Sequence, residues 1–328
     1  MKIILLGNMP ATGAANLRAR LGTDHEIAVI ADPAEVSSRI AEFKDADVIV
    51  GGPLTDEIVA NCPRLQLFHV FRGGIDGLGI ELLPPHVKVA NTFHHEIGVA
   101  EFAVAAMLVL TRKIITYDRS LRAGDWAGSV ICGEPPDQTT LSGKKAMIVG
   151  LGRIGSEIAK RGRAFGMLLV AVSRRPDEPS DLVDQRVGYD RLREILPTVD
   201  YVVASCRLSS ETTGLFDKEA FSLMKESAIF VNVARGQVVN DGALYEAIRD
   251  SEIAGAAADV WNQMPANPKD TCFPSPHPLH EHANVLFSPN RSSWTWQMVE
   301  DRMRDVAENV TRIATGKSII NDVTTQEL

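Results

Sequence analysis

The sequence contains few cysteines and no closely spaced pair of them. The four cysteines stand at positions 62, 132, 206 and 272, so there is no CxxC motif and no dense disulfide framework. This pattern fits reduced thiols and favours a cytoplasmic location. A long apolar run is also missing, because FAVAAMLVL is only nine residues long, too short to cross a bilayer. The first residues, MKIILLG, have too short an apolar core for a secretory signal and are typical of a strand.

An excess of positive charge is missing as well. The chain has 34 Lys and Arg against 42 Asp and Glu, a formal net charge of −8. An acidic chain is a poor match for nucleic acid or an anionic membrane, so neither is expected as a partner. The rest of the composition is that of an ordinary globular protein, with 45% hydrophobic and 23% charged residues. A length of 328 residues favours two domains.

Short apolar runs alternate with segments of helical length. The first series comprises KIILLG, ADVIVGG, LQLFHVF and VKVAN, with helical segments such as residues 34–44 between them. The second series comprises KAMIVGLG, LLVAVS, VDYVVASC, AIFVNVA, GAAADV and NVLFSP. This alternation predicts βαβ units and therefore two α/β domains with parallel sheets.

Three segments outside these strands also carry expectations. Residues 98–126, between the two series, form the longest predicted helix. Residues 124–143 are rich in Gly, Pro, Asp and Thr and are expected to form a linker or an arm that contacts a second copy in a dimer. A helix carrying Trp294 and Trp296 is expected after the last strand.

The sharpest local motif is a glycine pattern in KKAMIVGLGRIGSEIAKRGRAFGM. Gly150, Gly152 and Gly155 form GxGxxG directly after an apolar strand and before a helix, and Arg153 and Ile154 complete the turn. In a dinucleotide-binding turn the first glycine permits the tight turn, and the second lets a pyrophosphate approach the backbone. The third lets helix and strand pack closely. An ordinary glycine-rich turn is the alternative, but the flanking strand and helix favour dinucleotide binding.

The end of the next predicted strand indicates which dinucleotide is bound. NAD-binding proteins usually place Asp or Glu about 20 residues after the turn, to bind the ribose hydroxyls. Here the strand ends AVSRRPD, so Ser173, Arg174 and Arg175 take that place. A hydroxyl and two guanidinium groups suit a 2′-phosphate, which a carboxylate would repel. The prediction is NADP, with NAD also possible, and idle surface arginines are the alternative.

Four longer segments carry a resemblance to a known family. They are VAEFAVAAMLVLTRKI, LSGKKAMIVGLGRIGSEIAKRGRAFGM, LSSETTGLFDKEAFSLMKESAIFVNVARGQVVNDGALYEAI and IAGAAADVW. They resemble the D-isomer-specific 2-hydroxyacid dehydrogenases. The resemblance implies a Rossmann-like dinucleotide-binding domain, residues 99–290, inserted into a flavodoxin-like substrate domain, residues 1–98 plus 291–328. It also implies an oxidoreductase that acts on a small anionic 2-oxo or 2-hydroxy acid, and a homodimer.

The resemblance implies roles for individual residues. Arg235, in NVARG, matches the arginine that binds the substrate carboxylate and polarises its carbonyl, with a structural ion pair as the alternative. Gly73 and Gly74 match the loop whose N–H groups hold the same carboxylate, and Arg72 is a further contact for the substrate anion. Asp259 matches the acceptor for the nicotinamide amide. The remaining positions of the implied cofactor pocket are Cys206, Thr212, Val233 and Ala234.

Two positions depart from the family pattern. The family's acid–base histidine follows a strand-end proline, where this chain has Asn290, and the position of the partner glutamate holds Met264. A carboxamide cannot release a proton, and a general acid commonly contributes about a hundredfold to ten-thousandfold in rate. We therefore expect an atypical proton donor and weak activity on simple 2-oxo acids. The alternative function is a catalytically silent NAD(P)-binding sensor or scaffold protein.

Histidines elsewhere are candidates for the missing acid. NTFHHEIGVAE places His94 and His95 in one extended segment, where adjacent side chains point in opposite directions, so at most one faces a ligand. His95 is the predicted catalytic histidine, with ordinary loop contacts as the alternative. A second group, His277, His280 and His282 beside Cys272, lacks an ordered ligand geometry, so no metal site is predicted.

Overall fold

The computed structural model describes residues 1–126, 128–267 and 270–324. The chain divides into two compact units. Unit 1 comprises Met1–His95 and Trp294–Leu328, and unit 2 comprises Glu96–Ser293. Unit 2 is therefore inserted between the two chain segments of unit 1. Each unit has its own parallel sheet, which confirms the predicted class of two α/β domains.

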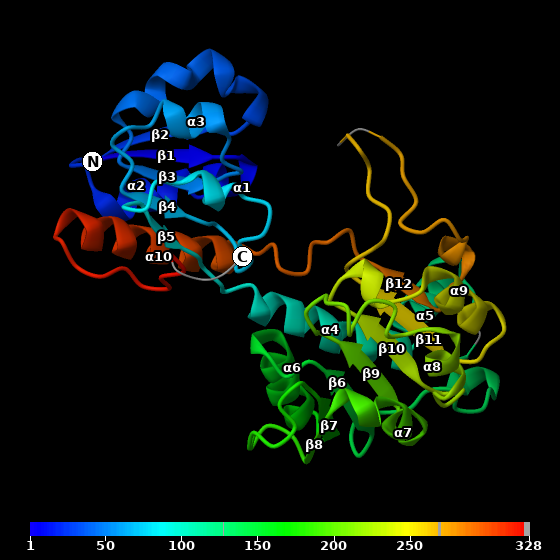
Figure 1. Ribbon diagram of the computed structural model, residues 1–328. Coiled ribbons are helices and arrows are strands. Elements are labelled where there is room, and N and C mark those ends of the chain that lie inside the picture. Colours follow the sequence, from blue (N-terminus) through cyan, green and yellow to red (C-terminus); the bar gives the residue numbers. More distant parts are fainter. Residues whose placement is uncertain (127, 268–269, 325–328) are drawn as a thin grey trace. The chain divides into compact units, whose positions relative to one another are not determined.

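Unit 1 contains a five-stranded parallel sheet in the order β2-β1-β3-β4-β5 (Figure 1). Its strands are β1 (Lys2–Leu6), β2 (Glu26–Ile30), β3 (Val48–Gly51), β4 (Leu67–His69) and β5 (Lys88–Ala90). Helices α2 (Ala14–Leu21) and α10 (Trp296–Ala314) pack on one face of this sheet. The other face is covered by α3 (Asp56–Ala60) and the 3₁₀ helix η2 (Ser37–Asp45). The remaining helical turns are α1 (Asn8–Thr12), η1 (Pro33–Glu35) and η3 (Ile80–Leu82).

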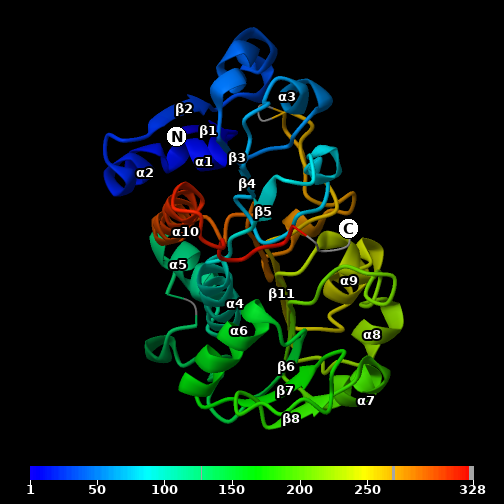
Figure 2. The same cartoon turned by 60° about the vertical axis from the view of Figure 1, so that its left-hand side comes forward.

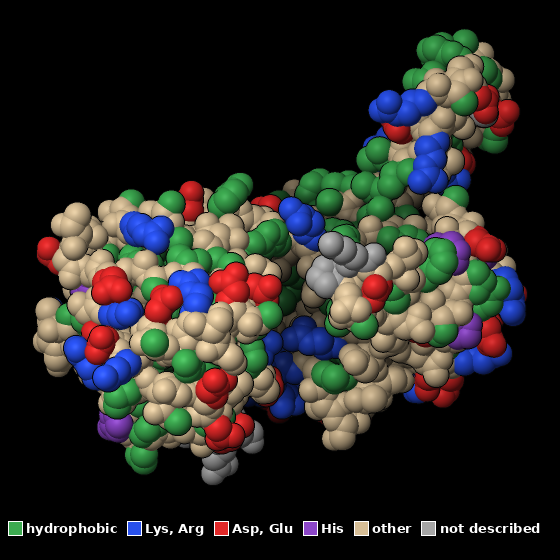
Figure 3. Space-filling view, turned by 90° about the horizontal axis from the view of Figure 1, so that it is seen from above, with side chains coloured by type: hydrophobic (Ala, Val, Ile, Leu, Met, Phe, Trp, Pro, Cys, Tyr) green, Lys and Arg blue, Asp and Glu red, His purple; other side chains and the backbone are tan. Residues whose placement is uncertain are grey.

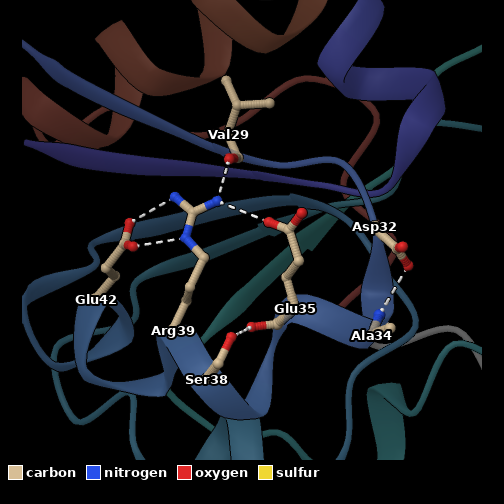
Figure 4. Close-up of polar contacts among 7 residues, drawn as sticks. All are labelled: Val29, Asp32, Ala34, Glu35, Ser38, Arg39 and Glu42. Atoms are coloured by element: carbon tan, nitrogen blue, oxygen red, sulfur yellow. Dashed lines mark hydrogen bonds and ion pairs between the residues drawn. The ribbon is translucent and has the colours of Figure 1, made fainter.

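The α-helix expected over residues 34–44 is a pair of 3₁₀ helices instead, η1 and η2. Arg39 holds them together, because its guanidinium donates to both carboxylate oxygens of Glu42, at 2.7 and 3.0 Å (Figure 4). The same group donates to the carbonyl oxygen of Val29 at 2.8 Å and to the Glu35 carboxylate at 3.2 Å. These bonds tie the 3₁₀ segment to β2, which regular helical spacing alone does not predict.

Unit 2 contains a seven-stranded parallel sheet in the order β12-β11-β10-β9-β6-β7-β8. The strands are β6 (Lys145–Val149), β7 (Leu168–Val172), β8 (Gln185–Val187), β9 (Tyr201–Ala204), β10 (Ile229–Asn232), β11 (Gly255–Ala258) and β12 (Val285–Phe287). All strands named from the sequence are present. The two that were missed, β2 and β8, lie at sheet edges and are partly exposed. Strand β8 (QRV) has no apolar run, whereas the apolar run of β2 (EIAVI) was not recognised.

Helices cover both faces of the seven-stranded sheet. One face packs against α4 (Glu96–Thr111) and α6 (Arg153–Ala164), which lie side by side (Figures 1 and 2). The other face packs against α7 (Leu192–Ile195), α8 (Lys218–Ser222) and α9 (Asp241–Arg249). Shorter 3₁₀ helices are η4 (Val130–Cys132), η5 (Tyr189–Arg191), η6 (Leu196–Thr198), η7 (Gly236–Val238) and η8 (Leu279–Glu281). The carboxyl ends of all seven strands point to the same edge, where the predicted cofactor residues stand.

The longest predicted helix, residues 98–126, is broken in two. The break falls at Lys113, whose backbone is left-handed with φ 47°, so α4 ends before it and α5 (Ile114–Arg122) begins after it. The Lys113 ammonium pairs with the Asp137 carboxylate at 2.5 Å, and Tyr117 donates to the same carboxylate at 2.6 Å. These contacts stabilise the break. The longest described helix is α10, with 19 residues.

Buried polar groups join the two chain segments of unit 1. Arg302 of α10 is 5% exposed and donates to the carbonyl oxygens of Phe71 at 2.7 Å and Phe93 at 2.8 Å. The helix begins at Trp296, and Thr295 caps it by accepting from a backbone N–H of the first turn. Trp294 therefore precedes the helix, contrary to the expectation that the helix carries both tryptophans.

The surface of the described chain is of mixed charge. On the face that Figure 3 shows, Lys and Arg side chains lie among Asp and Glu side chains, as the small negative net charge leads one to expect. Across the described residues, no helix combines the length and the apolar character that crossing a membrane requires.

Candidate active site

The glycine pattern forms the turn between β6 and α6. Gly150 has φ 98°, and a Cβ added there would lie 2.7 Å from the Cα of Cys206. A Cβ on Gly155 would lie 2.0 Å from the carbonyl oxygen of Gly150, so close packing requires glycine at both positions. At Gly152, by contrast, no atom of the described chain lies within 4 Å of an added Cβ. The backbone at Gly152 thus faces open space, as the second glycine of a pyrophosphate turn should.

The amino end of α6 can hold an anion. Gly152 is the N-cap of this helix, and no described side chain caps it, so the backbone N–H groups of the first turn, which includes Arg153 and Ile154, can donate to a bound anion. The Arg153 guanidinium lies 4.0 Å from the Glu96 carboxylate and is 59% exposed. Open backbone, N–H donors and the positive end of the helix dipole together fit the pyrophosphate of a dinucleotide.

The carboxyl end of β7 is polar and has no acid at the expected ribose position. Ser173 is 7% exposed, and its hydroxyl accepts a hydrogen bond from Nε of Arg186 at 2.9 Å. Arg174 and Arg175 follow it on the surface. Arg186 was missed by the sequence analysis because it belongs to the edge strand β8, where Arg186 pairs with Ala171 in β7. It brings a third guanidinium to this end of the sheet.

The loop after β9 forms the neighbouring wall. Cys206 is buried against Gly150, and burial raises the pKa of its thiol to about 11. The thiol therefore stays protonated near neutral pH and packs as an apolar group. Thr212 is 2% exposed, donates to the carbonyl oxygen of Arg207 at 2.7 Å and accepts from the N–H of Ser209 at 2.8 Å. Its hydroxyl thus holds the loop in shape.

Arg235 follows β10 at the same edge and is exposed. Its guanidinium donates to the carbonyl oxygen of Ala234 at 2.7 Å, and both Val233 and Ala234 are buried. The Asn232 side chain shapes this turn by accepting from the Ala234 N–H and donating to the Arg235 carbonyl, both at 3.0 Å. Within the described part of the chain, the contact of the Arg235 guanidinium is this backbone carbonyl and no carboxylate pairs with it, so the structural ion pair considered from the sequence is not observed. The guanidinium can bind an anionic ligand.

Asp259, directly after β11, organises the loop that follows β12. Its carboxylate is 4% exposed and accepts from the Ser288 hydroxyl at 2.5 Å, from the Arg291 N–H at 2.8 Å and from the Ser292 N–H at 3.1 Å. The Ser292 hydroxyl donates to the second oxygen. Asn290 lies within this loop and has a left-handed backbone, φ 55°, which Asn tolerates better than most residues. The contacts between Asp259 and the loop were not predicted, because about thirty residues separate the partners.

The two departures from the family pattern are both on the surface. Asn290 is exposed, and Met264 is 70% exposed. Trp261, between Asp259 and Met264, donates through Nε1 to the carbonyl oxygen of Ser288 at 2.8 Å. This bond ties the start of the segment that carries Met264 to the same loop. Neither the carboxamide nor the thioether can release a proton.

In unit 1, the predicted anion-binding loop follows β4. Asn91 donates to the carbonyl oxygen of Gly73 at 2.7 Å, which fixes the first glycine of the pair, and Gly74 is exposed. The Arg72 guanidinium donates to the carbonyl oxygen of Asp76 in its own loop. In this geometry Arg72 stabilises the loop.

The adjacent histidines of unit 1 have different surroundings. Nε2 of His94 lies 2.8 Å from Oδ2 of Asp305, which also accepts from the Thr92 hydroxyl at 2.6 Å. His95 lies instead beside the glycine loop, since a Cβ added to Gly73 would be 3.4 Å from Cε1 of the His95 ring. The structure thus separates the two candidates, but not by the alternation of an extended segment, since the backbone of His94 is left-handed with φ 68°.

The remaining histidine cluster packs through its rings. His277 stacks on Tyr245 with centroids 5.4 Å apart, and His280 stacks on Phe273 at 3.9 Å. His282 meets the Tyr245 ring edge-on at 5.9 Å. Among the residues with described placement, no group of His, Cys, Asp and Glu side chains has the arrangement of a metal site.

Comparisons with known proteins all identify 2-hydroxyacid dehydrogenases and reductases as similar to this chain. The family model for the D-isomer specific 2-hydroxyacid dehydrogenase, NAD binding domain, matches residues 104–291. The chain is 31% identical over 299 residues to a glyoxylate reductase of Aeropyrum pernix. The aligned region covers 87% of this chain and 85% of that protein. It is 30% identical over 292 residues to a D-3-phosphoglycerate dehydrogenase of Methanocaldococcus jannaschii, of which it spans 53%. A D-isomer specific 2-hydroxyacid dehydrogenase family protein of Aeromonas salmonicida has a similar structure, with a TM-score of 0.78, 25% identity and 98% of each chain covered.

Proposed function

Because the chain belongs to the D-isomer specific 2-hydroxyacid dehydrogenases, a family of NAD(P)-dependent oxidoreductases, we propose that it reduces a small anionic 2-oxo acid with NADPH. One observation carries this proposal. The exposed Arg235 stands at the sheet edge that also holds the pyrophosphate-binding turn after β6. A sensor of the dinucleotide alone needs no second anion-binding group at that edge. When bound, the nicotinamide supplies a hydride to the substrate carbon.

Arg235 binds the substrate carboxylate and carbonyl oxygen through two parallel N–H bonds. The same donors stabilise the negative charge that develops on the carbonyl oxygen as the hydride arrives. In unit 1, Gly73, Gly74 and Arg72 are proposed as anion contacts from the match of the sequence to the family pattern alone. Replacing Arg235 with Ala is expected to lower kcat/KM by about a hundredfold to a thousandfold, in line with the loss of one charge-stabilising donor. NADPH affinity should remain close to that of the wild type.

The proton comes from a group other than residue 290. Asn290 can donate a hydrogen bond to the carbonyl oxygen, but it keeps its proton. We propose His95, because a histidine titrates near neutral pH and its ring lies beside Gly73, whereas His94 is held by Asp305. His95→Ala should therefore lower kcat more than His94→Ala. Equal effects of the two substitutions would exclude His95 as the donor.

The cofactor proposal is a preference for NADPH of about tenfold or more over NADH. It is supported by Ser173, Arg174 and Arg175 where an NAD enzyme has a carboxylate. Replacing Arg174 and Arg175 with Ala should remove most of the preference, and calorimetry with both cofactors measures it. Further contacts with the cofactor are proposed for the walls of the same edge, Cys206, Thr212, Val233 and Ala234, and for Asp259 through the loop that it organises.

A second candidate function is a catalytically silent NAD(P)-binding sensor. It is favoured by the exposed Asn290 and Met264, which leave both positions of the family's proton relay without a titratable group. A screen of NADPH oxidation across 2-oxo acids and imines distinguishes the two functions, with Arg235→Ala as the control. Turnover that depends on Arg235 supports a reductase. Tight NADPH binding without turnover of any substrate in the screen supports the sensor.

We further propose a cytoplasmic homodimer. The four cysteines are free, which supports a reducing compartment. Large apolar side chains are exposed along α5 and the arm after it, and the most exposed are Val130 at 87% and Ile131 at 81%. The double substitution Val130→Asp and Ile131→Asp should yield a monomer in analytical ultracentrifugation. Met9→Asp, at an exposed apolar residue of unit 1, should leave the assembly unchanged.

A further inference from the structure

The charged groups around the end of β7 form a connected set, which we call the β7 anion site: Ser173, Arg175, Glu178 and Arg186. Arg186 is its centre, with a side chain that is only 12% exposed. Its Nε donates to the Ser173 hydroxyl at 2.9 Å, and its Nη1 donates to the carbonyl oxygen of Glu178 at 2.6 Å. The guanidinium is thus fixed in position by the protein before any ligand binds.

The carboxylate of Glu178 bridges two guanidinium groups. One oxygen accepts from Nη2 of Arg186 at 2.9 Å, and the other lies 3.7 Å from Nη1 of Arg175. The Glu178 side chain is 51% exposed and that of Arg175 is 79% exposed. The exposed carboxylate of Glu178 is therefore the charge partner of the largely buried Arg186 guanidinium.

We propose that Glu178 is an internal substitute for the 2′-phosphate of NADP and must leave Arg186 for that phosphate to bind. This inference rests on the proposed preference for NADPH. A phosphomonoester carries more negative charge than a carboxylate near neutral pH and offers three acceptor oxygens, so it competes successfully for the two guanidinium groups. The 2′-hydroxyl of NADH is uncharged and does not displace the carboxylate.

The Ser173 hydroxyl supports this assignment. It accepts from Arg186, which leaves its own proton to donate to an acceptor such as a phosphate oxygen. A carboxylate at position 173 would have paired with Arg186 directly and excluded a phosphate. Glu178 is the one acidic residue among the four that define the site, and its side chain is 51% exposed. The site can therefore exchange the Glu178 carboxylate for a 2′-phosphate. Glu178 therefore opposes phosphate binding and sets how strongly the protein prefers NADPH.

Glu178→Gln tests the proposal directly, with dissociation constants of NADPH and NADH measured by calorimetry. The substitution should tighten NADPH binding by about twofold to fivefold, the range for releasing a partly exposed ion pair, and leave NADH binding unchanged. Asp177→Asn is the matched control, since it removes an equal charge one residue away. It should have a smaller effect on NADPH than Glu178→Gln. If NADPH affinity does not rise, or if both cofactors gain equally, or if the control has the same effect, the substitute role is wrong.

Arg186→Gln provides the second arm of the test. It should weaken NADPH binding by about tenfold or more, because a charge-assisted hydrogen bond to the phosphate is lost. Unchanged NADH binding would show that the variant is folded, and an equal loss for both cofactors would contradict the proposal. A wild-type protein with equal affinity for the two cofactors overturns the proposed NADPH preference. The inference about Glu178 still stands in that case if Glu178→Gln creates a preference for NADPH.

Discussion

The buried polar side chains of the two units make different kinds of contact. In unit 1, Arg302 and Asp305 of α10 are buried and bond to the other chain segment, Arg302 to the carbonyl oxygens of Phe71 and Phe93 and Asp305 to the Thr92 hydroxyl. In unit 2, Ser173 and Asp259 are buried at the carboxyl ends of strands. Unit 1 consists of two chain segments and uses its interior polar groups to join them, whereas unit 2 is continuous in sequence. Substitutions of the α10 residues that join the segments of unit 1 should therefore change stability, and substitutions at the strand ends of unit 2 should change binding or catalysis.

Arg302→Met should give the largest effect on stability. It leaves the carbonyl oxygens of Phe71 and Phe93 buried without their donor, which is expected to cost about 2–5 kcal/mol. Differential scanning calorimetry should show a markedly lower unfolding temperature for the variant. NADPH binding below that temperature should match the wild type. Unfolding at the wild-type temperature would contradict the role assigned to Arg302 in joining the segments.

His69 makes the stability of unit 1 sensitive to acid. Burial lowers the pKa of this histidine from 6.5 to about 4. The unfolded chain therefore binds the proton more readily than the folded one, so stability is highest above pH 6.5 and falls as the pH drops toward 4. The loss amounts to about 3 kcal/mol over this window. Urea unfolding at several pH values should show a smaller loss for His69→Leu, while the exposed His86→Gln should behave like the wild type.

Gly152→Ala should weaken NADPH binding without changing the stability of unit 2. The position has room for a Cβ, so the unfolding temperature should not change. The methyl group would keep the pyrophosphate away from the backbone, and NADPH affinity should fall by about tenfold to a hundredfold. Gly155→Ala is the counterpart, because its Cβ would clash with the Gly150 carbonyl and lower stability by about 1–3 kcal/mol. Equal thermal destabilisation of the two variants would remove this distinction.

Asn290→His combined with Met264→Glu should raise turnover of glyoxylate by about tenfold, at the low end for general acid catalysis. Histidine, like asparagine, is among the residues that tolerate a left-handed backbone, so the loop should keep its shape. Steady-state kinetics with NADPH measure the gain, and Met264→Glu alone is the control. A wild-type enzyme that already reduces glyoxylate at tens per second would show that no acid is missing.

Much of the fold could be predicted because buried parallel strands are apolar on both faces and therefore stand out in the sequence. The edge strand β8, with the sequence QRV, does not stand out in this way, so the contribution of Arg186 was missed. The apolar residues of β2, IAVI, were not recognised as a strand. The break at Lys113 was also missed, since it depends on contacts with Asp137, which no helical pattern reveals.

The candidate site was predictable where backbone geometry determines the residue type. Gly150 and Gly155 must be glycine because of close packing, so their spacing identifies the turn. The different surroundings of His94 and His95 could not be foreseen, because the Asp305 that holds His94 is 211 positions away in the chain. The role of Asp259 as the acceptor that shapes a distant loop was hidden for the same reason.

The control of that loop by Asp259 has an evolutionary consequence. The backbone around residue 290 is held by bonds to the residues on either side of it, Ser288, Arg291 and Ser292, and the side chain of residue 290 takes no part in them. Among residues that tolerate a left-handed backbone, such as Asn, Asp and His, a lineage can therefore exchange the residue at this position by single codon changes while the loop persists. Acid–base chemistry can be lost and regained on an inherited scaffold, and new substrates can be tried at each step without refolding the protein.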